Sequence, residues 1–151
     1  MEHKEPRPMD WQERYQDILA HLKGRGRRLT PQRLAILKIL AISEGHPTVE
    51  QIHQSILREY PTTSLATVYK TVNLLGAEGQ VLELEFSEMP NRYDGNKPYP
   101  HPHVICKQCG KILDSEVIAL EEVTRKIMAE TGFLIMDHRL DFYGLCTECQ
   151  K

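Results

Sequence analysis

The chain has 151 residues, 40% of them hydrophobic, and a formal net charge of −2, so it can form one or two packed domains but carries no global positive field. Residues 1–9 are polar and charged, unlike a secretory leader, and no apolar run approaches the length of a membrane span. Because its four cysteines suit metal binding better than disulfides, we expect a cytoplasmic protein without a membrane segment.

Four segments in the N-terminal part have the periodicity of amphipathic helices. Apolar residues recur at intervals of three and four residues, and Thr30, Thr48 and Ser64 are suited to cap the last three helices. The predicted helices cover residues 11–24, a segment opening at Pro31 and ending before Pro47, residues 49–60 and residues 65–78.

The fourth predicted helix has the outer face of an element that enters a DNA major groove. Its exposed side carries small and hydrogen-bonding residues with one cation, Lys70, and Tyr69 lies at the border. Residues 18–43 add a basic run without any Asp or Glu. The residues expected to face inward are Leu65, Val68, Val72 and Leu75.

A hairpin is predicted after these helices, with strands at residues 81–86 and 92–94. Three helices followed by a hairpin is the order of a winged helix-turn-helix domain. Simple amphipathic packing is the alternative for any one of these helices. We expect a DNA-binding domain at residues 1–91 and a hinge at residues 92–102, which include a Pro- and Gly-containing linker.

Two Cys-x-x-Cys pairs predict a tetrahedral zinc site in the remaining residues, 103–151. The ligands are Cys106, Cys109, Cys146 and Cys149, and they would hold one structural Zn²⁺ per chain. Between the pairs we expect a hairpin around the first pair, a helix from Val117 to Gly132 and an extended segment at residues 133–143. The predicted fold class is therefore α+β, with a winged helix-turn-helix domain and a small zinc-bound α/β dimerisation domain.

Five motifs, in order, resemble the ferric uptake regulator family of bacterial metal-dependent repressors. They are Arg-Leu-Thr-Pro-Gln-Arg at residues 28–33, Gly-His-Pro-Thr at 45–48, Ser-Leu-Ala-Thr-Val-Tyr at 64–69, His-x-His-x-x-Cys-x-x-Cys-Gly-Lys at 101–111 and Tyr-Gly-Leu-Cys-x-x-Cys at 143–149. The resemblance implies a homodimer that binds double-stranded DNA at a palindromic operator. The residues expected at the DNA are Arg28, Arg33, Ser64, Thr67, Tyr69 and Lys70.

The resemblance also implies a regulatory metal site at the hinge. Its ligands in this chain would be His46, Asp94, His101, His103 and Asp114. Imidazole and carboxylate ligands suit one Fe²⁺ or Mn²⁺ per chain, whereas the thiolates retain zinc. Taken singly, His46 could be an exposed loop histidine, and Asp114 could merely precede a helix.

One position indicates a subgroup of the family. This chain has Asp94 where iron-uptake regulators tend to have Glu, and it resembles peroxide-sensing members, in which the rings corresponding to His46 and His101 are oxidised. The alternative is an iron- or manganese-responsive uptake regulator without peroxide sensing. A further metal site seen in some relatives is not expected here, because Pro100 and Pro102 replace its ligands and only Glu121 and His138 remain.

We therefore expect a metal-dependent transcriptional repressor and not an enzyme. A metalloenzyme that uses the His and Asp ligands is the alternative from another class, but five protein ligands leave little room for substrate. A zinc-stabilised protein–protein adaptor is the third reading, and it predicts no metal-dependent affinity for DNA.

Overall fold

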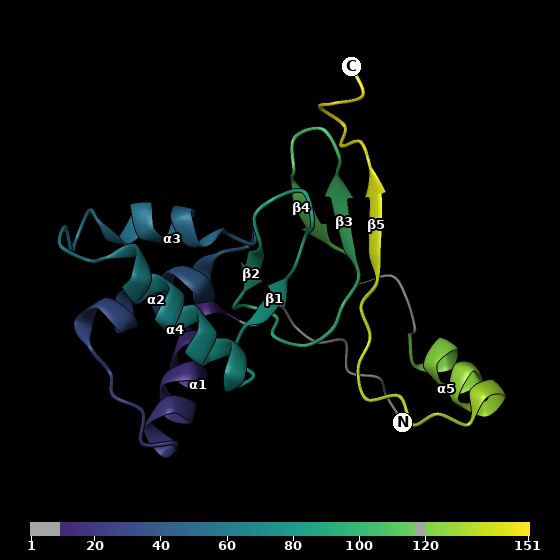
Figure 1. Ribbon diagram of the computed structural model, residues 1–151, viewed down its shortest axis with the longest axis horizontal. Helices are drawn as coiled ribbons and strands as arrows, with labels where there is room; N and C mark the ends of the chain where they lie inside the picture. The colour runs from purple at the N-terminus through teal and green to yellow at the C-terminus, as the bar shows by residue number, and fades with distance from the viewer. Residues whose placement is uncertain (1–9, 117–119) are drawn as a thin grey trace. The chain divides into compact units, whose positions relative to one another are not determined.

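The computed structural model describes residues 10–116 and 120–151, and the chain divides into two compact units (Figure 1). The first unit is Met1–Pro98 and the second is Tyr99–Lys151. The division falls inside the segment 92–102 that the sequence indicates as a hinge, and the domain limits given above stay predictions. Residues 1–9 and 117–119, and with them the predicted start of the helix at Val117, lie outside the described residues.

The first unit has the element order of a winged helix-turn-helix domain. Helices α1 (Trp11–Gly24), α2 (Pro31–Ile42), α3 (Val49–Ile56) and α4 (Leu65–Ala77) precede the antiparallel strands β1 (Leu82–Leu84) and β2 (Arg92–Asp94). All four helices contribute buried apolar side chains to one core, so their amphipathic pattern serves a single packing interface. The α+β fold class is confirmed.

Local capping sets the starts of α2, α3 and α4 as the sequence predicts. Thr30 accepts a 3.2 Å hydrogen bond from the backbone N–H of Arg33, and Ser64 accepts one of the same length from Thr67. Thr48 and Gln51 form a reciprocal capping box, with hydrogen bonds of 2.9 and 3.1 Å.

Three details of the predicted elements are wrong. Helix α3 ends at Ile56 instead of Tyr60, because a tight turn follows and closes on the 2.8 Å hydrogen bond from Tyr60 N to Ile56 O. The strand expected at residues 81–86 is limited to β1, Leu82–Leu84. Leu65 is 38% exposed because it begins α4, whereas Thr71 is buried and its hydroxyl donates to the carbonyl oxygen of Thr67.

The chain that leaves β2 packs closely against α2. A Cβ at Gly95 would lie 2.7 Å from the Cβ of Leu40, so only glycine permits this approach. The next residue, Asn96, donates a 3.0 Å side-chain hydrogen bond to the carbonyl oxygen of Ala41. The backbone that follows Asp94 is therefore held directly on the core of the first unit.

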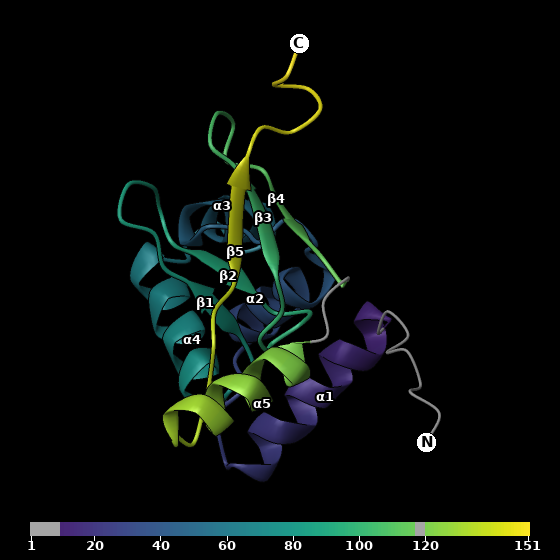
Figure 2. The same cartoon turned by 90° about the vertical axis from the view of Figure 1, so that its right-hand side faces the viewer.

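The second unit contains a three-stranded sheet in the order β4-β3-β5 (Figure 2). Strands β3 (His103–Cys106) and β4 (Ile112–Asp114) form the predicted hairpin, and β5 (Asp141–Gly144) pairs with β3 in the parallel direction. Helix α5 (Leu120–Thr131) connects the hairpin to the last strand. The extended segment expected at residues 133–143 is a strand only from Asp141 onward.

The second unit buries few apolar side chains. Among its described residues only Ile105, Cys106 and Ile112 are buried hydrophobics, and α5 contributes none. Apolar side chains on all three strands and on α5 remain exposed, among them Val104, Leu113, Val123, Ile127 and Phe142. The described part of α5 therefore has no buried face. None of the helices within residues 10–116 and 120–151 combines the length and apolar character needed to cross a bilayer.

Candidate metal centres

The four cysteines come together as the sequence predicts. The Sγ atoms of Cys106, Cys109, Cys146 and Cys149 all lie within 4.8 Å of one another, and none of them forms a disulfide. Sulfurs at the corners of a zinc tetrahedron are about 3.8 Å apart, given Zn–S bonds of roughly 2.3 Å. The Cys109 and Cys146 sulfurs are 3.7 Å apart, which is close to that spacing, so the four thiols have the type and proximity of zinc ligands.

Local backbone structure explains how the cysteines converge. The turn after β3 brings the N–H of Gly110 to the carbonyl oxygen of Cys106 at 2.9 Å, and Gly110 adopts a φ of 74°. Parallel pairing of β5 with β3 then delivers the second cysteine pair beside the first. The backbone N–H of Cys146 donates to the Cys106 sulfur at 3.3 Å, which joins the two turns.

The protonation of these thiols also fits a cation site. Hydrogen bonds from the backbone of Cys109 and Cys146 lower the pKa of Cys106 to about 6. A hydrogen bond with the neighbouring Cys146 side chain, together with burial, raises the pKa of Cys149 to about 12. Four thiolates at this spacing therefore need a divalent cation to offset their repulsion.

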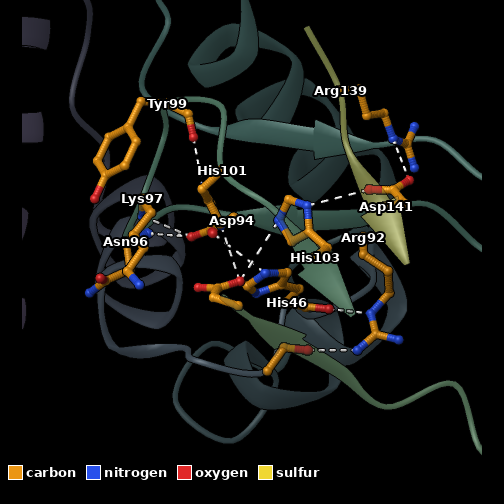
Figure 3. A network of polar contacts seen from close by, with 12 residues as sticks. His46, Arg92, Asp94, Asn96, Lys97, Tyr99, His101, His103, Arg139 and Asp141 are labelled. Carbon is orange, nitrogen blue, oxygen red and sulfur yellow. Dashed lines mark hydrogen bonds and ion pairs between the residues drawn. The ribbon is translucent and has the colours of Figure 1, made fainter. Parts of the chain in front are cut away.

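In the first unit, His46 and Asp94 form a buried pair (Figure 3). His46 Nε2 lies 3.5 Å from Asp94 Oδ2, and both side chains are 1% exposed. The other Asp94 oxygen, Oδ1, accepts backbone hydrogen bonds from Asn96 at 3.0 Å and Lys97 at 2.8 Å. The reading of His46 as an exposed loop histidine is therefore wrong.

The backbone of His46 is held in an unusual conformation. Its φ of 53° makes it the one non-glycine residue with a positive φ in the part of the chain described here. The Arg92 guanidinium donates to the carbonyl oxygens of Gly45 and His46, and the N–H of Tyr93 donates to the carbonyl oxygen of Pro47 at 3.0 Å. These bonds offset the strain, which is on the order of 1 kcal/mol, and fix the loop beside β2.

In the second unit, His101, His103 and Asp114 lie together. Asp114 Oδ1 is 3.1 Å from His101 Nε2 and 3.8 Å from His103 Nε2, and the two imidazole centroids are 4.3 Å apart. Asp114 pairs with His103 across β3 and β4, so it is a strand residue. His101 Nδ1 lies 2.7 Å from the carbonyl oxygen of Tyr99, which leaves Nε2 directed to Asp114.

The donor types match the expected metals. Each unit offers imidazole nitrogen with carboxylate oxygen, the combination that suits Fe²⁺ or Mn²⁺ better than the thiolate cluster does. Glu121 and His138 are exposed and belong to no group of three or more His, Cys, Asp or Glu ligands in residues 10–116 and 120–151.

The residues expected at DNA are mostly exposed. Arg28, Ser64, Tyr69 and Lys70 are exposed, whereas Arg33 and Thr67 are half-buried. The Ser64 and Thr67 hydroxyls also meet at 3.0 Å in the cap of α4, and the Arg33 side chain donates to the carbonyl oxygen of Arg28. Tyr69 donates a 3.3 Å hydrogen bond to Glu50, whose negative charge raises the pKa of the tyrosine.

Glu78 reduces the positive charge that the basic run at residues 18–43 presents to solvent. It lies just after α4 and forms ion pairs with His21 at 3.0 Å, Arg25 at 3.2 Å and Arg27 at 2.6 Å. Two of the arginines counted as a basic surface are therefore neutralised by an acid that lies outside the run. The sequence shows Glu78 but not that the α1–α2 turn folds back onto it.

Three polar residues near the ligands were missed by the sequence argument. Arg14 and Arg92 hold the backbone around β2, and Asp141 on β5 lies 3.5 Å from His103. The sequence of α1 does not indicate that its single arginine, Arg14, is buried. The residues next to Asp141 likewise do not indicate which strand β5 pairs with.

Comparison with known proteins gives one consistent result. The Ferric uptake regulator family model matches residues 24–143. The chain is 40% identical over 135 residues to the peroxide-responsive repressor PerR of Staphylococcus saprophyticus. The aligned region covers 89% of this chain and 90% of that protein. The solved Campylobacter jejuni peroxide stress regulator is 34% identical, with a TM-score of 0.69, over 89% of this chain and 97% of that one. The Helicobacter pylori ferric uptake regulator Fur, described as having three functional metal binding sites, is 26% identical, with a TM-score of 0.80, over 97% and 98% of the two chains.

Proposed function

We propose that this chain, which belongs to the ferric uptake regulator family, is a metal-dependent DNA-binding repressor of transcription that senses peroxide. The observation that carries the proposal is the pair of imidazole–carboxylate groups, one in each unit, in a chain whose relatives include peroxide-responsive repressors. When the ligands of one metal ion come from both units, binding of the ion restricts how the two units move relative to each other.

The proposed regulatory site takes His46 and Asp94 from the first unit and His101, His103 and Asp114 from the second. Its occupant would be Fe²⁺ or Mn²⁺, one per chain, while the four cysteines hold zinc. When both groups of ligands bind one ion, the hinge between the units is restricted. A restricted hinge favours DNA binding, because two recognition helices must match two half-sites at one spacing.

The proposed DNA surface is the exposed side of α4 together with the Arg28–Arg33 corner of α2. Lys70 and Tyr69 are the exposed side chains of α4 best suited to contact phosphate and base edges. Arg28 contributes a cation that is not engaged by Glu78 in the ion pairs described above.

The second unit is proposed to form a homodimer. Few apolar side chains of this unit are buried, so a single copy has only a small hydrophobic core. The apolar side chains that its sheet and α5 leave exposed include Val104, Leu113, Phe142, Val123 and Ile127. A second copy supplies the same apolar surface around a two-fold axis. Two winged helices related by that axis fit a palindromic operator.

We assign peroxide sensing to the histidine ligands of the proposed regulatory site. Iron(II), when bound, supplies the electrons that activate hydrogen peroxide next to the imidazoles. In the net change, one ring C–H of His46 or His101 becomes C–OH, and the second peroxide oxygen leaves as water. The oxygenated ring binds metal more weakly, so the tie between the units is lost and the DNA is released.

Mass spectrometry of the protein loaded with Fe²⁺ and treated with a small excess of hydrogen peroxide tests this function. The expected result is a gain of one oxygen, roughly 16 Da, on peptides that contain His46 or His101. His53, whose ring contacts the Thr63 carbonyl oxygen in the first unit, serves as the internal control and should stay unmodified.

The same experiment separates the alternative function. Protein loaded with Mn²⁺ should bind operator DNA in a gel-shift assay and should stay unoxidised. If the iron form also stays unmodified and bound to DNA while peroxide is consumed, the chain is an iron- or manganese-responsive uptake regulator, and the role given to Asp94 in peroxide sensing is wrong.

A further inference from the structure

We propose that Asp141 is a positioning residue for the proposed metal ligand His103, because it accepts a hydrogen bond from the ring N–H at Nδ1, so that the lone pair for the metal lies on Nε2. The inference rests on the proposed function in one respect only, namely that His103 is a metal ligand. The proposed hydrogen bond between Asp141 and His103 does not depend on that function, because it can be tested in protein without the regulatory metal.

The strand register places these residues in one row. His103 lies on the central strand β3, opposite Asp114 on β4 and opposite Asp141 on β5. Side chains that are paired in register emerge on the same face of a sheet. The imidazole therefore stands between two carboxylates, one on each neighbouring strand.

The two nitrogens of His103 face different carboxylates. Nδ1 lies 3.5 Å from Asp141 Oδ1, and Nε2 lies 3.8 Å from Asp114 Oδ1. A formed N–H···O bond is about 2.9 Å long, so the Nδ1–Oδ1 contact becomes a hydrogen bond when the two side chains approach by about half an ångström. The geometry thus assigns one nitrogen to each carboxylate (Figure 3 shows the Asp141 side).

Asp141 is itself held in place. Its Oδ2 accepts a 2.8 Å bond from Arg139 Nε and lies 3.4 Å from the Tyr143 hydroxyl, and its side chain is 9% exposed. These partners bind one oxygen and direct the other, Oδ1, toward His103. Oδ1 is buried and accepts no hydrogen bond from the described residues in this geometry, so a proton on Nδ1 relieves the cost of burying it.

The consequence for metal binding follows from the chemistry of imidazole. A neutral ring carries one proton, and the nitrogen that lacks it is the one able to bind a metal. If Asp141 holds the proton on Nδ1, Nε2 presents its lone pair on the side of Asp114, which is another of the proposed ligands. A carboxylate partner also makes the ring more basic, and loss of such a partner typically weakens metal binding about 10–100-fold.

Asp141 could instead serve only as an ion-pair partner for Arg139, which would stabilise the sheet without affecting His103. The two roles predict different results for the tautomer of His103. A purely structural role leaves the tautomer unchanged when Asp141 is replaced and the fold is retained.

The test uses full-length, zinc-containing protein without regulatory metal, labelled with ¹⁵N. Two-bond ¹H–¹⁵N spectra of the histidine rings show which nitrogen of His103 carries the proton. In the wild type we expect the proton on Nδ1, in Asp141→Ala a mixture or the reverse tautomer, and in Asp141→Asn partial retention, because the amide oxygen can still accept. Asp137→Ala is the matched control, since the Asp137 carboxylate is exposed and accepts from the adjacent His138 N–H.

Titration with Mn²⁺ then measures affinity in the same variants. We expect Asp141→Ala to bind Mn²⁺ about 10–100-fold more weakly, Asp141→Asn to lie between, and Asp137→Ala to match the wild type, all with unchanged zinc content. An unaltered His103 tautomer in a folded Asp141→Ala protein, or a wild-type ring protonated on Nε2, overturns the inference. If the wild type binds no Mn²⁺ at all, the proposed function fails, and the NMR result still decides whether Asp141 sets the tautomer.

Discussion

Arg14 Nε donates a 2.7 Å hydrogen bond to the carbonyl oxygen of Gly95, the residue that follows the candidate ligand Asp94. The same guanidinium donates to the carbonyl oxygen of Gln80 at 2.6 Å and to its side chain at 3.2 Å. One buried cation on α1 therefore ties the end of β2 to the turn after α4. Through Arg14, the backbone next to Asp94 is connected to the C-terminal end of the helix proposed to contact DNA.

The Arg14 hydrogen bonds predict that Arg14→Met will destabilise the first unit by about 1–3 kcal/mol, because two carbonyl oxygens lose a charged donor in a buried setting. Thermal unfolding followed by circular dichroism measures the destabilisation. Gln16→Met, on the exposed side of α1, is the matched control and should leave the unfolding temperature nearly unchanged. Equal stability of both variants would show that the Arg14 hydrogen bonds contribute little.

Glu78 predicts a dependence of stability on acid pH. Hydrogen bonds from His21 and Arg27 lower the pKa of Glu78 from 4.5 to about 2 in the folded protein. Because the folded pKa is depressed, the stabilising contribution is complete above pH 4.5 and is lost as the pH falls toward 2. Glu78→Gln should therefore lower the unfolding temperature at neutral pH but not near pH 2.

The control for this comparison is Glu13→Gln, an exposed glutamate on α1. Its unfolding temperature should follow that of the wild type at each pH. A Glu78→Gln deficit that is the same at neutral and at acid pH would mean that the ion pairs with His21, Arg25 and Arg27 do not set the difference.

Lys70 predicts the electrostatic part of DNA binding. Lys70→Ala removes one cation per protomer, so it should weaken operator binding and reduce the slope of log affinity against log salt by about 0.9 for each phosphate that is no longer neutralised. Fluorescence anisotropy at several salt concentrations measures both quantities. Lys126→Ala, which removes an exposed lysine paired with Glu122 on α5, should change neither, and an unaltered slope in Lys70→Ala would place the DNA surface elsewhere.

The cysteine cluster predicts that Cys106→Ser will lose zinc and that its second unit will no longer fold or dimerise. Only a few apolar side chains are buried in this unit, so the metal supplies much of its stability. Zinc content by mass spectrometry and dimerisation by sedimentation velocity give the result. Full zinc retention in the variant contradicts the four-thiolate site.

Local signals account for the features that were correctly predicted from the sequence. The starts of α2, α3 and α4 follow from Thr30, Thr48 and Ser64, because a cap involves residues only three positions apart. The convergence of four cysteines could be predicted because each Cys-x-x-Cys turn directs two sulfurs to one point. The end of α3 was placed too late because Tyr60 continues the apolar periodicity although its backbone leaves the helix.

The neighbours of the candidate metal ligands depend on pairings between distant parts of the chain. Asp141 meets His103 only because β5 joins β3 in parallel and in one register, and a shift by one residue would turn its side chain to the other face. Arg14 meets Gly95 across 81 positions of sequence, and Glu78 meets Arg27 across 51. The sequence by itself thus determined the candidate ligand types, the helix starts and the two Cys-x-x-Cys turns, since each depends on neighbouring residues. The tertiary structure decided which buried side chains orient the ligands, because hydrogen bonds between distant segments form only when the strands pair and the helices pack.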